Sequence, residues 1–476
     1  MAGLLSALQR TSQALNAQSQ GIYTAGRNMA NVNNPAYARQ RVQLGDSGTY
    51  QTPLGPQSYG VEVQAVQNVR DALLDRQVVR ETSYTASLEA ESEAYRKAEL
   101  ALGQRIDRQS DAQFVGDSTA TGASQGVGEA FDDLLNAFSS LAANPRSDAE
   151  RQILFQKAQT LVTRMRTTDA RLEDVQQELS DAVSSDVKSV NDLLESISNL
   201  NKQIARFEVG NQGAALDLRD QRQAKLEALA QYVDFEVEDV GGSAGQIRIL
   251  SRDATDAPVV LLDKGNDPAA MTFDGTNILA GNPAAALNLR GGSMQGRLTA
   301  RDGAVADLRD GLDVLAAQLV TTLNSIYNPG AAGFDFFAAG GTTAATIALD
   351  PALAASNIRS TNTAEPGAND VALAISDVMS RTFSQGGGDI IDGTLGSHYR
   401  GLVSSIANAT AATSGHYDDQ NALKRLVLER RDSVSGVSLD EEMTDLIKYQ
   451  RAFDASAKVM QIMDQMLEVV VNGLVR

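Results

Sequence analysis

The sequence contains one motif typical of a serine nucleophile but very few residues that could complete a catalytic site. Residues 122–126, Gly-Ala-Ser-Gln-Gly, match the pattern G-x-S-x-G, in which a sharp turn exposes a serine for attack on an acyl group. A Ser124 nucleophile needs a histidine base, and the chain has only His398 and His416. The motif lies in a stretch rich in Ser, Thr and Gly, without a convincing buried strand before it. We therefore interpret it as a linker and predict no catalytic residue.

Metal chemistry lacks ligands as well. The chain has no cysteine, which excludes disulfides, thiolate metal sites and cysteine nucleophiles together. The two histidines are eighteen residues apart, a spacing that matches no zinc motif. Residues 117–129 resemble a calcium loop only at their ends, because Gly128 holds the position where such loops carry a bidentate glutamate. We predict neither a metal nor a cofactor.

Composition and charge favour a helical structural protein. A length of 476 residues allows two to four domains, and 42% hydrophobic residues suffice for their cores. Only 5% of residues are aromatic, whereas enzymes with deep pockets usually carry more. The net charge of −19 would repel nucleic acid and disfavours membrane surfaces. We therefore predict no nucleic-acid partner. The sequence also shows no membrane-spanning apolar segment and no signal-peptide pattern, so we predict no membrane insertion.

Heptad spacing of apolar residues is the strongest pattern, and it occurs at both ends of the chain. An amphipathic helix with one uncovered face is not stable in water by itself. We therefore predict that the two terminal helices pair with each other and with equivalent helices of neighbouring copies. Small residues beside the N-terminal stripe, at Ser12, Ser19 and Gly26, are expected to allow close approach. The predicted interface consists of Leu5, Leu8, Leu15, Ile22, Met29, Leu439, Leu446, Phe453, Met460, Met463, Leu467, Val470 and Leu474.

Charge supports this pairing of the termini. Residues 1–45 contain four arginines and no acidic residue, whereas residues 437–476 contain seven acidic residues and four basic ones. Opposite net charges favour association of the two segments and disfavour pairing of each with itself. Ser438 and Glu441 form a predicted capping box at the start of the C-terminal helix.

A second set of helices is predicted between the termini. A capping box at Ser147 and Glu150 precedes apolar residues spaced three and four apart, which predict a helix over residues 148–208. Such a helix would be roughly 90 Å long. Short β-branched runs separated by Gly and Asn/Asp clusters predict strands within residues 233–290. Helices are also expected over about 68–112 and 303–328, and mostly loops over 330–395.

The predicted fold class is therefore mainly α with a β-containing insertion. It comprises terminal α-helices that form a coiled-coil-like pair, a long helical bundle and a central β-rich domain. Three nested domains are expected. They are a terminal polymerisation domain (1–45 plus 437–476), a helical bundle (46–232 plus 291–330 plus 396–436) and a β-rich or irregular outer insertion (233–290 plus 331–395).

The stretch from Asn28 to Gln40, NMANVNNPAYARQ, resembles a known family signature. The pattern N-x-A-N-x-N-T-P-G-Y-x-R is typical of the axial proteins of the bacterial flagellum, namely the rod, hook and hook-associated subunits. The chain departs from it at Asn34, where the family has Thr, and at Ala36, where it has Gly. The motif residues present here are Asn28, Ala30, Asn31, Asn33, Pro35, Tyr37 and Arg39.

Two further segments resemble the hook-associated protein 1 branch of that family. Residues 435–453 are similar to its closing helix. Residues 217–222, Asp-Leu-Arg-Asp-Gln-Arg, are similar to its L-x-D-Q-R-D segment, with Gln223 replacing the final Asp. The resemblance therefore involves both ends and the middle of the chain.

The resemblance implies a non-enzymatic structural subunit of the flagellum that joins hook to filament. Such proteins are exported unfolded through the flagellar type III channel, so the implied location is secreted, at the hook–filament junction. The implied partners are further copies in a ring or tube, the hook protein, and a neighbouring hook-associated protein or flagellin. An export chaperone is expected on the C-terminal helix, whose apolar face is otherwise uncovered. The alternatives are another axial subunit (hook or distal rod protein) and a rod-associated wall hydrolase.

Overall fold

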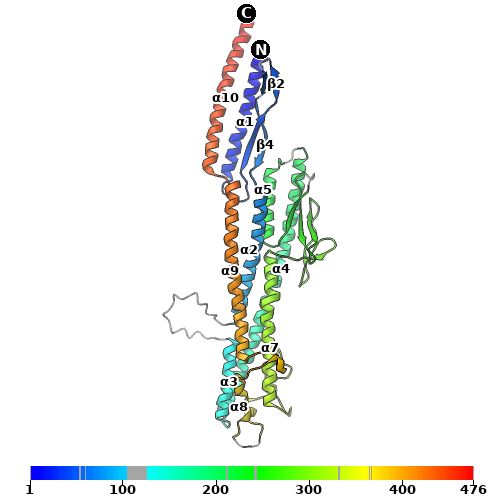
Figure 1. Ribbon diagram of the computed structural model, residues 1–476, viewed down its shortest axis with the longest axis vertical. Coiled ribbons are helices and arrows are strands. Elements are labelled where there is room, and N and C mark those ends of the chain that lie inside the picture. The colour runs from blue at the N-terminus through cyan, green and yellow to red at the C-terminus, as the bar shows by residue number, and fades with distance from the viewer. Residues whose placement is uncertain are drawn as a thin grey trace, which may run out of the picture. The chain divides into compact units, whose positions relative to one another are not determined.

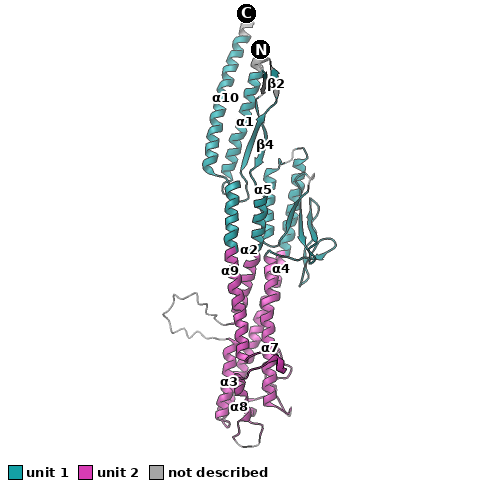
Figure 2. Ribbon diagram, viewed as in Figure 1, with its two compact units in different colours: residues 1–85, 187–292, 420–476 teal, residues 86–186, 293–419 magenta. Residues whose placement is uncertain are grey.

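The computed structural model describes most of the chain, which divides into two compact units. The described residues are 2–52, 55–58, 60–103, 126–210, 213–240, 244–330, 333–363, 365 and 367–474, and side chains are not described for 2–5, 49–50, 52, 56–58 and 471–474. Residues 122–125 of the serine motif and most of the calcium-like segment lie outside this set. Unit 1 contains residues 1–85, 187–292 and 420–476, and unit 2 contains residues 86–186 and 293–419 (Figure 2).

The two ends of the chain lie together in unit 1. Helix α1 (Ala2–Ala30) packs along helix α10 (Leu439–Leu474) (Figure 1). A β-arm follows α1 and packs against it. In this arm β1 (Gln40–Asp46) pairs antiparallel with β4 (Val61–Asn68), and β2 (Thr49–Thr52) pairs with β3 (Gly55–Ser58).

The β-rich insertion also belongs to unit 1. It follows helix α5 (Leu216–Ala230). The antiparallel order β5-β6-β7 is formed where β-branched runs were predicted to be strands, and a second three-stranded sheet has the order β10-β9-β8. The strands are β5 (Glu236–Asp239), β6 (Ile247–Arg252), β7 (Pro258–Asp263), β8 (Thr272–Phe273), β9 (Ile278–Ala280) and β10 (Ala285–Ala286).

Three long helices contribute residues to both units. They are α2 (Ala72–Ala101), α4 (Asp148–Glu208) and α9 (Leu395–Ser435). The predicted continuous helix over 148–208 is confirmed, and the Glu150 N–H donates to Ser147 Oγ at 3.2 Å at its start. Its predicted apolar stripe is buried at positions such as Leu161 and Leu172. Near the end of this helix the buried face includes Ile204, whereas Phe207 is 69% exposed.

Unit 2 has an apolar core built by helices and by the segment after residue 330. Helix α3 (Val127–Ala143) and helix α7 (Ala306–Tyr327) supply much of it. The ring of Phe336 lies with its centroid 5.2 Å from that of Phe138 and 5.5 Å from that of Tyr327. The other elements of unit 2 are α6 (Ser293–Ala300), the π-helical η1 (Arg301–Val305), α8 (Asp370–Ser376), and the 3-10 turns η2 (Ala355–Asn357), η3 (Asp377–Met379) and η4 (Gln385–Gly387).

The two segments predicted to form one outer insertion belong to different units. Residues 233–290 are in unit 1, whereas residues after 330, including the buried Phe336, Phe337 and Ile347, are part of the core of unit 2. The three-domain division thus remains a prediction, and the compact units divide the chain differently. A mainly α fold with a few small sheets is confirmed. Among the described helices, none has the length and apolar character needed to cross a membrane.

Candidate functional site

Small residues of α1 form the seam that faces α10. The buried positions of α1 include Ala17, Gly21 and Ala25. A Cβ atom at Gly21 would lie 2.7 Å from Tyr449 Cδ1, so the Tyr449 ring rests directly on the glycine backbone. Farther along the pair, Thr11 Oγ1 lies 3.8 Å from Met463 Sδ. Small residues therefore allow the two helices to approach closely.

The large apolar stripe predicted on α1 lies beside this seam. Successive helical residues are about 100° apart around the axis, so a shift of one position turns the interface to another face. Ser12 and Ser19 are exposed, and a Cβ at Gly26 would meet nothing within 4 Å, so α10 does not approach closely at these positions. Close approach of a neighbouring copy there stays a prediction. The side chain of Leu5 lies outside the described set. The other four predicted residues, Leu8, Leu15, Ile22 and Met29, are half-buried.

Helix α10 turns one face toward α1 and leaves other apolar residues in solvent. Its half-buried residues include Leu446, Phe453, Met460, Met463 and Leu467, all of them predicted. Leu439 and Val470, also predicted to be interface residues, are 49% and 37% exposed, so α1 does not cover them and their contact with neighbouring copies stays a prediction. The side chain of Leu474 lies outside the described set. We define the exposed apolar surface of α10 as Leu439, Met443, Ile447, Val459, Ile462, Met466, Val469 and Val470, which are 37–72% exposed.

The family motif forms a buried polar junction next to the start of α10. Asn28, at the end of α1, is 1% exposed. Its Nδ2 donates to Gln40 O at 2.8 Å and to Glu442 Oε2 at 3.0 Å. Its Oδ1 accepts from Tyr37 OH at 2.8 Å and from the Gln40 N–H at 3.0 Å. Both donor hydrogens and both acceptor positions of the amide are therefore used.

Arg39 completes this junction. Its Nε donates to Glu442 Oε1 at 2.6 Å, and its guanidinium also contacts Glu441 and Asp445. Its backbone N–H donates to Ser435 O at 2.9 Å. Burial acts to lower the pKa of Arg39, but the Glu442 and Glu441 carboxylates outweigh this and raise it. Glu441 thus contacts Arg39, although a capping role at Ser438 was predicted for it.

The remaining motif residues shape the loop between α1 and β1. The Asn31 side chain donates to Arg27 O at 2.9 Å, whereas Ala30, Asn33 and Pro35 are exposed. Asn34 Oδ1 accepts the Ala36 N–H at 3.2 Å. This Asx turn closes the loop without the glycine that the family has at position 36.

Two carboxylates of α5 hold the motif loop from the other side. Both carboxylate oxygens of Asp217 accept from Arg27 Nη2, at 2.6 and 2.7 Å, and Oδ1 also accepts from Gln40 Nε2 at 3.1 Å. Asp220 is 4% exposed and accepts from the Ala38 N–H at 3.2 Å, besides Asn68 and Arg70. Burial raises the pKa of Asp220 to about 6, because it outweighs the opposing effect of Arg70.

Arg222, two residues after Asp220 on α5, contacts the β-rich insertion. Arg222 is 7% exposed, and its Nη1 donates to Asn201 Oδ1 at 2.8 Å and to Gly245 O at 2.7 Å. Burial lowers its pKa to about 10. The 217–222 segment stood out in the sequence only as a family resemblance. No spacing rule indicates that its acids hold the loop or that its arginine holds the insertion.

The chain is similar to flagellar proteins along almost its whole length. Residues 116–337 match the family described as the helical domain of flagellar hook-associated protein FlgK, and residues 431–473 match the C-terminal family of flagellar basal body rod proteins FlgEFG. Flagellar hook-associated protein 1 of Bacillus subtilis is 25% identical over 98% of both chains. The protein of the same name from Escherichia coli is 24% identical over 98% of this chain and 99% of its own. The chain is thus similar to flagellar hook-associated protein 1 over nearly its whole length.

A solved structure supports the same fold. The flagellar hook junction protein FlgK from Burkholderia pseudomallei matches 75% of this chain and all of its own, with a TM-score of 0.59 and 14% sequence identity. The resemblance inferred from the sequence is confirmed by the relatives and the helical-domain match described above.

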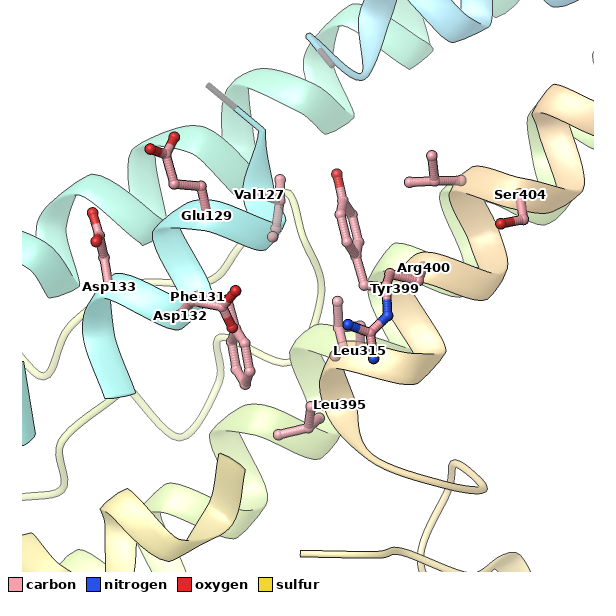
Figure 3. A pocket seen from close by; sticks show the side chains of 13 residues that line it. Val127, Glu129, Phe131, Asp132, Asp133, Leu315, Leu395, Tyr399, Arg400 and Ser404 are labelled. Carbon is pink, nitrogen blue, oxygen red and sulfur yellow. The ribbon is translucent and has the colours of Figure 1, made fainter. Parts of the chain in front are cut away.

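The described part of the chain shows no arrangement suited to catalysis at its two histidines. A pocket of about 440 Å³ in unit 2 lies between α3 and α9, where Phe131 and Asp132 face Tyr399 and Arg400 (Figure 3). Neither histidine lines it. Both lie on α9, eighteen residues and therefore roughly 27 Å apart, so they cannot serve one site. The described residues also contain no group of three His, Cys, Asp or Glu placed to hold a metal.

Proposed function

We propose that this chain is a structural subunit that joins the flagellar hook to the filament and polymerises through its terminal helices. The observation that carries the proposal is the exposed apolar surface of α10. Eight large apolar side chains remain 37–72% exposed when α1 has covered the other face. Apolar surface of this extent on one helix is a protein–protein contact site, because burying it in a partner is favourable.

The proposed partners follow from the family. Further copies of the chain cover the exposed apolar surface of α10 within a ring or tube. The hook protein contacts this assembly on one side, and a neighbouring hook-associated protein or flagellin contacts it on the other. The subunit is secreted, passes unfolded through the flagellar export channel, and resides at the hook–filament junction. Before assembly an export chaperone shields α10, because the same apolar residues would otherwise promote aggregation.

The experiment compares two double substitutions of equal charge in the full chain. Ile462→Asp with Met466→Asp places two carboxylates on the exposed apolar surface of α10, whereas Gln461→Asp with Gln465→Asp places them at exposed polar positions of the same turns. Each variant is expressed in cells that lack the native protein, and filaments attached to hooks are counted by electron microscopy. We expect the first variant to leave bare hooks and the second to attach filaments. Normal attachment with the first variant would show that this surface is not the assembly contact.

The alternative axial assignments have less support. A hook or distal rod protein shares the terminal helices, but residues 116–337 match the helical domain of the hook-associated protein. No contact among the described residues favours a wall hydrolase.

A further inference from the structure

Helix α10 is held to its own chain in two different ways along its length. At its first turn, Glu442 is 2% exposed and both of its carboxylate oxygens are bound, one by Arg39 and one by Asn28. Among the described side chains from Met443 to Val470, none is buried. The rest of the helix therefore contacts α1 only through half-exposed residues. Contacts of this kind open locally at lower cost than buried ones.

The polar contacts at the first turn depend on a charged carboxylate. Asn28 directs an amide hydrogen at Glu442 Oε2 while its other three hydrogen-bonding positions are occupied, and Arg39 directs a guanidinium hydrogen at Glu442 Oε1. Two donors therefore converge on one group that must accept from both. A glutamine at this position has one acceptor oxygen and a donor amide, so it would leave a donor facing a donor.

The neighbouring residue provides an internal comparison. Glu441 also contacts Arg39, but its side chain is 62% exposed against 3% for Glu442. An exposed ion pair contributes little, whereas removing one partner of a buried pair is strongly destabilising. The two adjacent glutamates thus share a partner but differ in the expected consequence of losing their charge.

We propose that Asn28 and Arg39 form a latch on Glu442 that keeps the first turn of α10 attached while the remainder of the helix opens. The family motif then serves to position α10 rather than to contact other copies directly. In the opened state the rest of α10 is free to contact a neighbouring copy while its first turn stays in place. This last step rests on the proposed assembly through the terminal helices.

Hydrogen–deuterium exchange of the full-length monomer tests the latch. In the native chain we expect amides of residues 442–446 to exchange about tenfold or more slowly than those beyond residue 457. Glu442→Gln should remove this difference by accelerating exchange at residues 442–446 about tenfold. Glu441→Gln should change the same amides by less than about threefold. Uniform protection along native α10, or equal effects of the two substitutions, would overturn the proposal.

Two readouts keep the result interpretable. Protection in α5, which is measured in the same experiment, reports whether unit 1 stays folded in the Glu442→Gln protein. If it does not, Arg39→Lys is the second variant, because it keeps the positive charge but lacks the Nε–H that donates to Glu442 Oε1. It should accelerate exchange at residues 442–446 while α5 stays protected, and unchanged exchange would refute the latch. Polymerisation is scored separately, so that its absence despite a native exchange gradient would count against the proposed function alone.

Discussion

Substitution of Gly21 by alanine should weaken the packing of α1 against α10, although alanine is the better helix former. The added Cβ would lie 2.7–2.8 Å from three carbons of the Tyr449 ring. Carbon atoms in contact are normally about 3.5–4.0 Å apart, so the ring or a helix must move by about 1 Å. Overpacking of this kind costs about 1–3 kcal/mol, and the gain in helix propensity returns about 1 kcal/mol. The expected net loss is therefore up to about 2 kcal/mol.

Gly26 is the matched control on the same helix. A Cβ at Gly26 would meet no atom within 4 Å, so Gly26→Ala should show only the gain in propensity, about 1 kcal/mol. The assay is hydrogen exchange of α1 amides in the monomer, in which protection reports the free energy of local opening. The two substitutions should shift this free energy in opposite directions.

A double-mutant cycle with Tyr449→Ala isolates the ring as the cause. Once the ring is removed, Gly21→Ala should no longer be destabilising, because the atoms that it would meet belong to Tyr449. The reasoning is refuted if Gly21→Ala stabilises α1 as much as Gly26→Ala does. It is also refuted if the loss persists without the Tyr449 ring.

Two other substitutions test contacts within the separate units. Asp220→Asn concerns pH: because the pKa of Asp220 is raised to about 6 from 3.8, the folded chain binds the proton more tightly than the unfolded chain. Its contribution favours folding below about pH 4 and is lost as pH rises through 6, by up to about 3 kcal/mol. Urea unfolding at pH 4.5 and 7.5 should show this loss of unfolding free energy in the native chain but not in the variant. An equal change in both proteins would contradict the prediction. Gly296→Ala should destabilise unit 2 by about 2–3 kcal/mol or more, because the new Cβ would meet the backbone oxygen of Ser87. Its thermal midpoint should fall below that of Gly401→Ala, where a Cβ meets nothing within 4 Å, and equal midpoints would show that α6 adjusts freely.

Local sequence patterns were sufficient to predict several of the secondary-structure elements. Residues 148–208 repeat apolar positions at helical spacing behind a capping serine, and they form one helix. The β-branched run at Ile247 forms a strand that pairs between two others. These predictions succeed because backbone conformation follows from side-chain periodicity, capping and β-branching within a few residues. The motif at residues 28–39 identified the family for a similar reason, since it is contiguous.

The face of each helix that becomes buried was decided by tertiary structure. Heptad spacing indicated that α1 is amphipathic, but it favoured the large residues Leu15 and Ile22. The seam with α10 instead runs through Gly21, one position away, because close helix packing selects the smallest residues. Likewise, the Gly-, Ala- and Thr-rich segment after residue 330 was predicted to form mostly loops. It still supplies Phe336 and Phe337 to the core of unit 2, a role that no local pattern indicates.

The polar junction at the start of α10 is a contact that the sequence alone did not predict. Asn28 and Glu442 are 414 positions apart, and each stood out in the sequence for a different reason. Asn28 belongs to the family motif, and Glu442 was counted as one charge in an acidic helix end. The residue types and the helices that carry them are determined locally by the sequence. That the two side chains meet, and that only the second of two adjacent glutamates is buried with Asn28, follows from the packing of α1 and α10, which depends on contacts between opposite ends of the chain.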